Sequence, residues 1–102
     1  MLPLILDKTV DTPEIILDKT QGTFDFLGTS MPANTKKYFE PVFTWIEKYN
    51  ESPNEETIVN FKMKYFNTSS TKSLLDVMIQ FKEIAKNGNM LIINWHFPVD
   101  DE

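Results

Sequence analysis

The segment that decides the fold reads Thr-Ile-Val-Asn-Phe-Lys-Met-Lys-Tyr-Phe and spans residues 57–66. Its apolar residues alternate with polar ones, so that Val59, Phe61, Met63 and Tyr65 share one side of the chain. A period of two residues is typical of a β-strand, and the lysines between them indicate that the other side faces water. We therefore predict a strand with one buried face over residues 57–66.

The residues after this strand predict a helix and a second strand. Apolar side chains recur there at helical spacing, namely Leu74, Val77, Met78, Phe81 and Ala85. Asn87-Gly88 is a typical helix end, and residues 90–97 form a nearly continuous apolar run that predicts a central strand covered on both faces. Strand, helix and strand in this order predict a right-handed parallel crossover.

The first thirty residues read as short strands and turns. Apolar runs at residues 4–6, 14–18 and 23–27 predict three strands, and Thr20-Gln21-Gly22 has the size and chemistry of a hairpin loop. We expect the third strand to stop at Gly28, which would allow the turn into a helix because glycine tolerates positive φ.

Residues 33–50 change to a helical period. Their apolar side chains fall on one helix face, namely Phe39, Val42, Phe43, Ile46 and Tyr49. Asn34 is expected to cap this helix. Pro41 leaves two alternatives open, which are a regular helix that begins near Glu40 and a helical turn over residues 35–40 that is kinked at the proline.

The expected order of elements is ββ(β)-α-β-α-β. An early hairpin joined to a parallel unit predicts an α/β fold, with a mixed sheet and helices packed on it. The chain has 102 residues, which is the size of one domain. We therefore expect residues 1–102 to form a single domain.

The composition narrows the classes of function. Fifteen acidic and ten basic residues give a net charge of -5, and every basic residue is lysine. Nucleic acid or an anionic membrane would require a basic surface, so neither is an expected partner. The absence of cysteine and the presence of one histidine argue against thiolate chemistry, a metal site and a catalytic triad. Without a recognisable signal or membrane span, the expected location is the cytoplasm.

The most distinctive local motif is Tyr65-Phe66-Asn67-Thr68-Ser69-Ser70. It places hydroxyl groups between the C-terminal end of a predicted strand and the N-terminus of a predicted helix, where sites gather in parallel sheets. A phosphate on Thr68 would add roughly −1.5 to −2 charges at that positively polarised helix end. A Ser/Thr cluster before a helix is most often only an N-cap, so both interpretations stay open from the residues alone.

His96 and the C-terminal acids are weaker candidates. A lone histidine could act as a general base, but no serine, cysteine or second histidine lies near it in the sequence. Asp100-Asp101-Glu102 could bind a divalent cation together with His96, yet these residues lack the spacing of a metal-binding loop. We therefore expect no cofactor, no metal and no enzymatic activity.

Several motifs follow one another over essentially the whole chain. They are Thr12-Pro13-Glu14-Ile15, Gly28-Thr29-Ser30-Met31-Pro32-Ala33-Asn34, Phe39-Glu40-Pro41 with Trp45, Tyr65 to Lys72, and Trp95 with Asp100-Asp101-Glu102. Together and in this order they resemble the SiaC family of bacterial regulatory phosphoproteins, and the Tyr-Phe-Asn-Thr-Ser-Ser element is the specific part.

The resemblance implies a domain similar to the anti-sigma-factor antagonist (STAS-like) fold, switched by reversible phosphorylation. The family's threonine in Asn-Thr-Ser-Ser falls on Thr68. The implied partners are a cognate Ser/Thr kinase, a PP2C-type phosphatase and a diguanylate cyclase, which the unphosphorylated form engages in cyclic-di-GMP signalling linked to biofilm behaviour. The switch loop and partner surface are expected to comprise Asn67, Ser69, Ser70, Thr71 and Lys72, together with Asn34.

The chain departs from the family pattern in two places. The family commonly has Tyr-Pro-Glu-Asn where this chain has Met31-Pro32-Ala33-Asn34, and this difference bears on which partner is bound. The family also tends to continue into a C-terminal helix beyond Glu102, and an apolar patch left without that helix would favour a homodimer. The alternative function is an unphosphorylated structural or protein-interaction domain in which Thr68 is only a helix cap.

Overall fold

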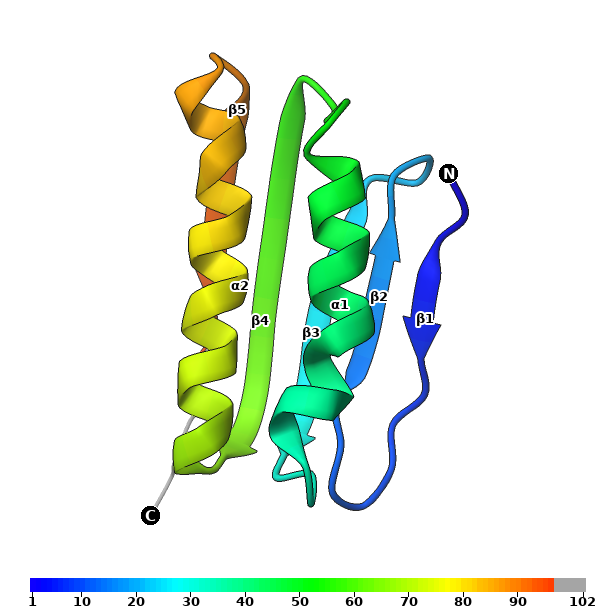
Figure 1. The fold of residues 1–102 in the computed structure, drawn as a ribbon, viewed down its shortest axis with the longest axis vertical. Helices are drawn as coiled ribbons and strands as arrows, with labels where there is room; N and C mark the ends of the chain where they lie inside the picture. Colours follow the sequence, from blue (N-terminus) through cyan, green and yellow to red (C-terminus); the bar gives the residue numbers. More distant parts are fainter. Residues whose placement is uncertain (97–102) are drawn as a thin grey trace.

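The computed structural model describes residues 1–96, which form a sheet with two helices (Figure 1). The sheet order is β1-β2-β3-β4-β5, with the first two pairings antiparallel and the last two parallel. The predicted mixed α/β fold and the parallel crossover are thus confirmed. The elements are β1 (Leu4–Leu6), β2 (Glu14–Asp18), β3 (Thr23–Ser30), α1 (Thr35–Tyr49), β4 (Glu56–Phe66), α2 (Thr68–Lys86) and β5 (Met90–Trp95).

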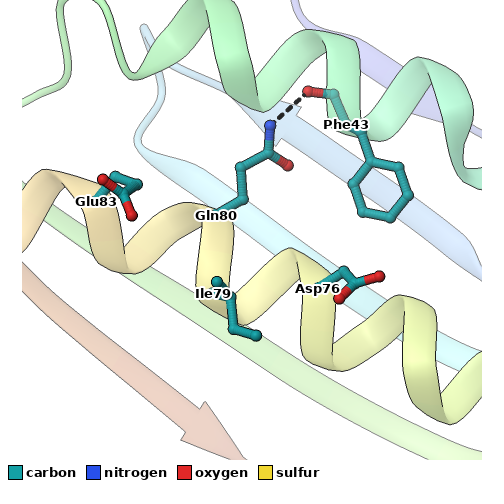
Figure 2. A pocket seen from close by; sticks show the side chains of 5 residues that line it. All are labelled: Phe43, Asp76, Ile79, Gln80 and Glu83. Carbon is teal, nitrogen blue, oxygen red and sulfur yellow. Dashed lines mark hydrogen bonds between the residues drawn. The ribbon is translucent and has the colours of Figure 1, made fainter.

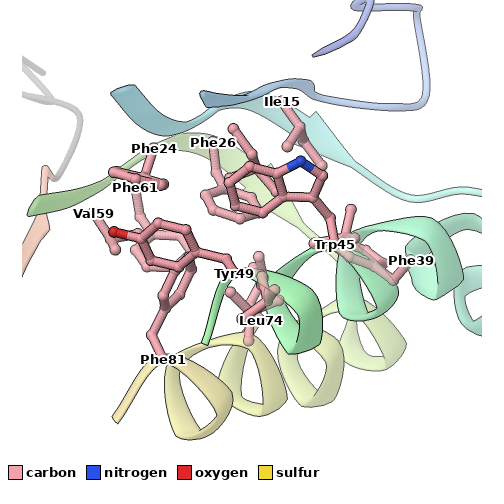
Figure 3. Packing of buried hydrophobic residues seen from close by; sticks show 14 of the residues in the cluster. Ile15, Phe24, Phe26, Phe39, Trp45, Tyr49, Val59, Phe61, Leu74 and Phe81 are labelled. Atoms are coloured by element: carbon pink, nitrogen blue, oxygen red, sulfur yellow. The ribbon is translucent and has the colours of Figure 1, made fainter. Parts of the chain in front are cut away.

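Both helices cover the same face of the sheet, and an aromatic core fills the space between the layers (Figures 1 and 3). Phe26 of β3 stacks on Phe61 of β4 with ring centroids 4.8 Å apart. Phe24 lies 5.0 Å from the ring of Tyr49, and the Tyr49 hydroxyl lies 2.7 Å from that of Thr57. The core therefore ties α1 to the two strands that lead into the helices.

A bulge changes the expected end of β3. The strand runs past Gly28 to Ser30, and its register against β4 shifts between Gly28 and Thr29. Gly28 pairs with Met63 and Thr29 pairs with Tyr65, so one residue of β4 is left over. Gly28 has a φ of 105°, which glycine adopts without a side-chain penalty. The expectation that β3 ends at Gly28 was therefore wrong, because Gly28 lies within the strand and permits the bulge.

The same bulge breaks the alternation predicted for β4. Val59, Phe61 and Met63 are buried as predicted, whereas Tyr65 is 54% exposed. The extra residue turns the following side chains out of the period-two pattern. The prediction for Tyr65 was therefore wrong.

Within residues 1–96, the strand β5 lies at the edge of the sheet and not at its centre. Its side chains alternate between half-buried and exposed, and Ile92 is exposed while Ile93 packs against the core. Periodicity cannot separate an apolar edge strand from a covered one when both faces carry apolar residues. The prediction of a central strand covered on both faces was wrong in these two respects.

The helices follow their apolar stripes with two local differences. The helix α1 begins at Thr35 and continues through Pro41, so the alternative that includes residues 35–40 is the closer one. The proline lacks the N–H that would bond to the carbonyl four residues earlier. In α2 the stripe ends on buried Ile84, while Ala85, expected on this stripe, is exposed.

Candidate functional site

The candidate site lies where the two helices begin. Because β3 and β4 are parallel neighbours, their C-terminal ends lie side by side at the same end of the sheet. The next element after each of these strands is a helix. The Asn34 side chain accepts a hydrogen bond from the Lys37 backbone N–H at 3.0 Å, which confirms it as the cap of α1. Asn67 does the same for α2 by accepting from the Ser70 backbone N–H at 2.9 Å.

Thr68 is the first residue of α2 and is not its cap. Since Asn67 occupies the capping position, the interpretation of Thr68 as an N-cap is wrong. The Thr68 side chain is exposed, and within residues 1–96 its hydroxyl makes no hydrogen bond. The hydroxyl is therefore available to chemistry from outside without disturbing the capping arrangement.

A buried pair of serines attaches the start of α2 to β3. The Ser70 hydroxyl donates to the Ser30 carbonyl at 2.9 Å, and the two hydroxyl oxygens lie 2.8 Å apart. The Asn67 backbone N–H also donates to the Ser30 carbonyl, at 3.1 Å. Ser70 was expected on the partner surface but is fully buried. It holds the first turn of α2 against the end of β3. Ser30 reaches this place because β3 continues beyond the bulge.

A second hydroxyl pair joins the first turns of the two helices. The Thr35 and Ser69 hydroxyl oxygens lie 2.7 Å apart, and the Ser69 hydroxyl donates to the Asn67 side chain at 3.2 Å. Because the Ser69 proton is directed to Asn67, the Thr35 hydroxyl is the donor in the interhelix contact. The residues that follow the two caps are thus held against each other.

A groove of about 720 Å³ runs between the helices from this contact, and we call it the interhelix groove. Its charged residues come from both helices, Lys36 and Glu40 from α1 and Lys72 and Asp76 from α2. The Lys72 ammonium lies 3.1 Å from the Asp76 carboxylate. The full lining is Thr35, Lys36, Glu40, Phe43, Thr44, Thr68, Ser69, Lys72, Ser73 and Asp76.

A smaller hollow of about 350 Å³ adjoins this groove and shares Phe43 and Asp76 with it (Figure 2). Across the helices, the Gln80 side-chain amide donates to the Phe43 carbonyl at 2.8 Å. The Gln80 side-chain oxygen is buried and has no hydrogen-bond partner among the described residues. This hydrogen bond links α2 to α1 beside the interhelix groove.

Some of the candidate residues predicted from the sequence line the interhelix groove, and others lie outside it. Thr68, Ser69 and Lys72 line the groove. Thr71 is exposed outside it, and its hydroxyl donates to the Asn67 carbonyl at 3.2 Å. His96 is exposed beyond β5, where its backbone N–H donates to the Phe61 carbonyl. The acids at 100–102 lie outside the described residues.

Sequence reasoning missed the contribution of α1 to the groove, which consists of Thr35, Lys36, Glu40, Phe43 and Thr44. A signal was present, because Asn34 and Asn67 are both caps and both are followed by a threonine. Nothing local in the sequence says that the two caps lie side by side.

Comparison with known proteins identifies the family. The model of the SiaC family, described as regulatory phosphoproteins, matches residues 6–102. The chain belongs to the SiaC family. None of the helices within residues 1–96 has the length and apolar character needed to cross a membrane.

Solved SiaC structures have the same fold. The chain superposes on apo-SiaC from Pseudomonas aeruginosa with a TM-score of 0.88 at 28% identity, over 96% of this chain and 81% of that one. It also matches the structure of the diguanylate cyclase SiaD in complex with its activator SiaC from the same organism, with a TM-score of 0.82 at 28% identity, over 91% of this chain and 76% of that one. An uncharacterized protein of Pseudomonas aeruginosa strain UCBPP-PA14 is 28% identical over all of this chain and 81% of its own length.

Proposed function

We propose that this SiaC-family protein is a phosphoswitch, in which reversible phosphorylation of Thr68 controls the binding of a diguanylate cyclase. The observation that carries the proposal is the position of Thr68, which lines the interhelix groove with an exposed hydroxyl that takes no part in capping α2. A kinase reaches this hydroxyl without opening the core. The added phosphate then lies within the groove.

The charge of the groove makes it sensitive to that modification. Two lysines and two acids line it, so their formal charges cancel. A phosphate brings roughly −1.5 to −2 charges and three acceptor oxygens, which turns a neutral groove into an acidic one. A partner that fits the neutral groove is repelled or displaced by the phosphorylated form.

The relative that was solved in complex supports the choice of partner. SiaC of Pseudomonas aeruginosa is the activator of the diguanylate cyclase SiaD and forms a complex with it. We extend this to a cyclase that the unphosphorylated form of the present chain activates, with effects on cyclic-di-GMP signalling and biofilm behaviour. Met31 and Ala33 lie in the loop before α1 and are exposed beside the site, so they are candidates for partner selectivity.

The remaining elements of the switch are supplied by other proteins. A cognate Ser/Thr kinase adds the phosphate and a PP2C-type phosphatase removes it, in the cytoplasm. In this proposal the chain acts through binding and has no catalytic activity of its own. Its organisation as one domain over residues 1–102 and its self-association as a homodimer stay predictions.

The test of the switch combines kinase treatment with cyclase binding. The protein is incubated with the cognate kinase and ATP, and the modified site is mapped by mass spectrometry. We expect phosphate in the peptide over residues 65–72, at Thr68. Thr68→Ala should fold normally, bind the cyclase and resist inhibition by the kinase, whereas Thr68→Asp should bind it at least tenfold more weakly.

The matched control is Thr71→Ala, because Thr71 has an exposed hydroxyl in the same helical turn but lies outside the groove. This variant should still be phosphorylated and switched. The absence of phosphate from residues 65–72 would exclude the proposal. Equal cyclase binding by Thr68→Asp and the parent would instead favour an interaction domain without a phosphoswitch.

A further inference from the structure

We propose that the phosphate on Thr68 is bound within the chain by Lys36 and Lys72, one lysine from each helix, so that it ties α1 to α2 across the interhelix groove. This inference rests on the proposed function, because it presupposes phosphorylation of Thr68. It adds the two side chains that recognise the phosphate and the change that the groove undergoes as a result.

Lys36 approaches Thr68 from the opposite helix. The Thr35–Ser69 hydroxyl contact of 2.7 Å fixes the first turns of α1 and α2 against each other, and Lys36 and Thr68 are the chain neighbours of these two residues. Both line the same groove. Lys36 is exposed and forms no ion pair with any residue in 1–96. Its four-carbon stem is flexible, so its ammonium can follow a phosphate in the groove.

Lys72 approaches from the same helix as Thr68. It lies four residues further along α2, which puts the two side chains on one helix face. In the unphosphorylated chain Lys72 pairs with Asp76 at 3.1 Å, also at a spacing of four residues. A phosphate carries about twice the charge of a carboxylate and more acceptor oxygens, so it competes with Asp76 for this lysine.

The polarity of the helices supports the same arrangement. Neither α1 nor α2 has an acidic residue in its first turn, so no carboxylate compensates the partial positive charge at either helix start. A phosphate at Thr68 stands between two such starts. This electrostatic contribution adds to that of the lysines and does not replace them.

The groove changes in two ways when both lysines turn to the phosphate. Asp76 loses its ion pair with Lys72, and Glu40, which has no ion pair with any residue in 1–96, stays unpaired, so the groove presents two unpaired carboxylates. The two helices are also linked by a bridge of ionic hydrogen bonds in addition to the Thr35–Ser69 contact. Phosphorylation therefore removes two basic side chains from any partner surface at the groove and makes the groove more rigid.

The test compares Lys36→Gln with Lys37→Gln. Both lysines are exposed neighbours in the first turn of α1, but Lys37 does not line the groove. Phosphothreonine is incorporated at position 68 during synthesis, so that the measurement does not depend on recognition by the kinase. The second pKa of the phosphate is measured by phosphorus NMR titration, and the melting temperature is compared with that of the unmodified chain.

In the parent we expect the two lysines to hold the second pKa of the phosphate below its ordinary value of about 6. Lys36→Gln should raise it by roughly 0.5 or more and should reduce the gain in melting temperature on phosphorylation, since one of two partly exposed cations is lost. Lys37→Gln should match the parent, and Lys36→Arg should restore the parent behaviour.

The outcomes separate this inference from the proposed function. If the phosphate in Lys36→Gln titrates as in the parent, the bridge is excluded, while the phosphoswitch stands as long as the kinase modifies Thr68 of the parent and cyclase binding falls. Equal shifts in Lys36→Gln and Lys37→Gln would indicate general surface charge and would also exclude the bridge. Failure of the kinase to modify Thr68 of the parent overturns both.

Discussion

The hydroxyl oxygens of Thr35 and Ser69 lie 2.7 Å apart, although 34 positions separate the two residues in the chain. Each follows closely on an asparagine that caps its helix. The contact therefore marks the point where two helix starts meet, beside the threonine that we propose as the phosphorylation site. The contributions of this contact, of the Asn67 cap and of the buried Ser70 hydroxyl to the free energy of unfolding can be measured separately.

The Thr35–Ser69 hydrogen bond should contribute a small, measurable amount to the free energy of unfolding. Thr35→Ala and Ser69→Ala remove one partner each, and the double variant removes both. We expect a coupling free energy of about 0.5–1 kcal/mol. The value is small because both hydroxyls form hydrogen bonds with water in the unfolded chain, so folding replaces those bonds and adds little. Urea denaturation of the four proteins measures it, and strictly additive effects on the free energy of unfolding would show that the contact contributes nothing.

Asn67 should matter more to stability than the threonine that follows it. Asn67→Ala removes the side-chain acceptor for the Ser70 backbone N–H and should lower the free energy of unfolding by about 1 kcal/mol. Thr68→Ala changes an exposed side chain without hydrogen bonds in residues 1–96 and should stay within about 0.5 kcal/mol of the parent. Denaturation curves that gave the reverse order would contradict the assignment of the cap.

Ser70 should be needed for the attachment of α2 to β3. Ser70→Ala removes a donor to the Ser30 carbonyl and leaves the buried Ser30 hydroxyl without this partner, at an expected cost of about 1–3 kcal/mol. Ser69→Ala provides the comparison, because Ser69 is exposed. Thermal and urea unfolding should show the larger loss for Ser70→Ala, and an equal loss in both variants would contradict a structural role of the buried pair.

Tyr38 should make the fold sensitive to alkaline pH. Its hydroxyl donates to the Pro13 carbonyl at 3.2 Å, and burial raises its pKa above the ordinary value of 10.0, while a side-chain hydrogen bond with Thr12 opposes the rise. The unfolded chain therefore loses this proton at a lower pH than the folded one. The stability that depends on the protonated phenol is complete below pH 10 and declines as the pH rises from 10 towards the higher pKa of the folded state.

Tyr38→Phe tests this dependence. Between about pH 9 and pH 11 its urea midpoint should fall less steeply than that of the parent, because phenylalanine has no proton to lose. Tyr65→Phe is the matched control, since Tyr65 is 54% exposed. Parallel curves for the parent and Tyr38→Phe across this range would show that burial of Tyr38 does not contribute.

Local patterns in the sequence account for most of the elements but not for their irregularities. The alternation over Val59, Phe61 and Met63 and the helical stripe from Leu74 to Phe81 are confirmed, because each repeats the period of its own secondary structure. The predicted burial of Tyr65 is wrong, because a bulge in the pairing of β3 with β4 shifts the register before this residue. A bulge depends on two strands, so one strand's pattern does not reveal it.

The place of β5 is a similar case. Residues 90–95 carry no charge, which resembles a strand at the centre of a sheet. Only the sheet order shows that β5 has a neighbour on one side alone within the described residues, and that the helices cover one face of the sheet. The number of neighbours of a strand is a property of the whole fold.

The sequence by itself determined the elements, the Asn-Thr-Ser-Ser motif at the start of α2 and the family that this motif indicates. Only the tertiary structure decided that Asn67, and not Thr68, caps that helix, and that Lys36 shares a groove with Thr68 and Lys72. The physical reason is that local periodicity reports the interactions of neighbours in the chain. The meeting of two helix starts requires the parallel pairing of β3 with β4, which brings together residues more than thirty positions apart.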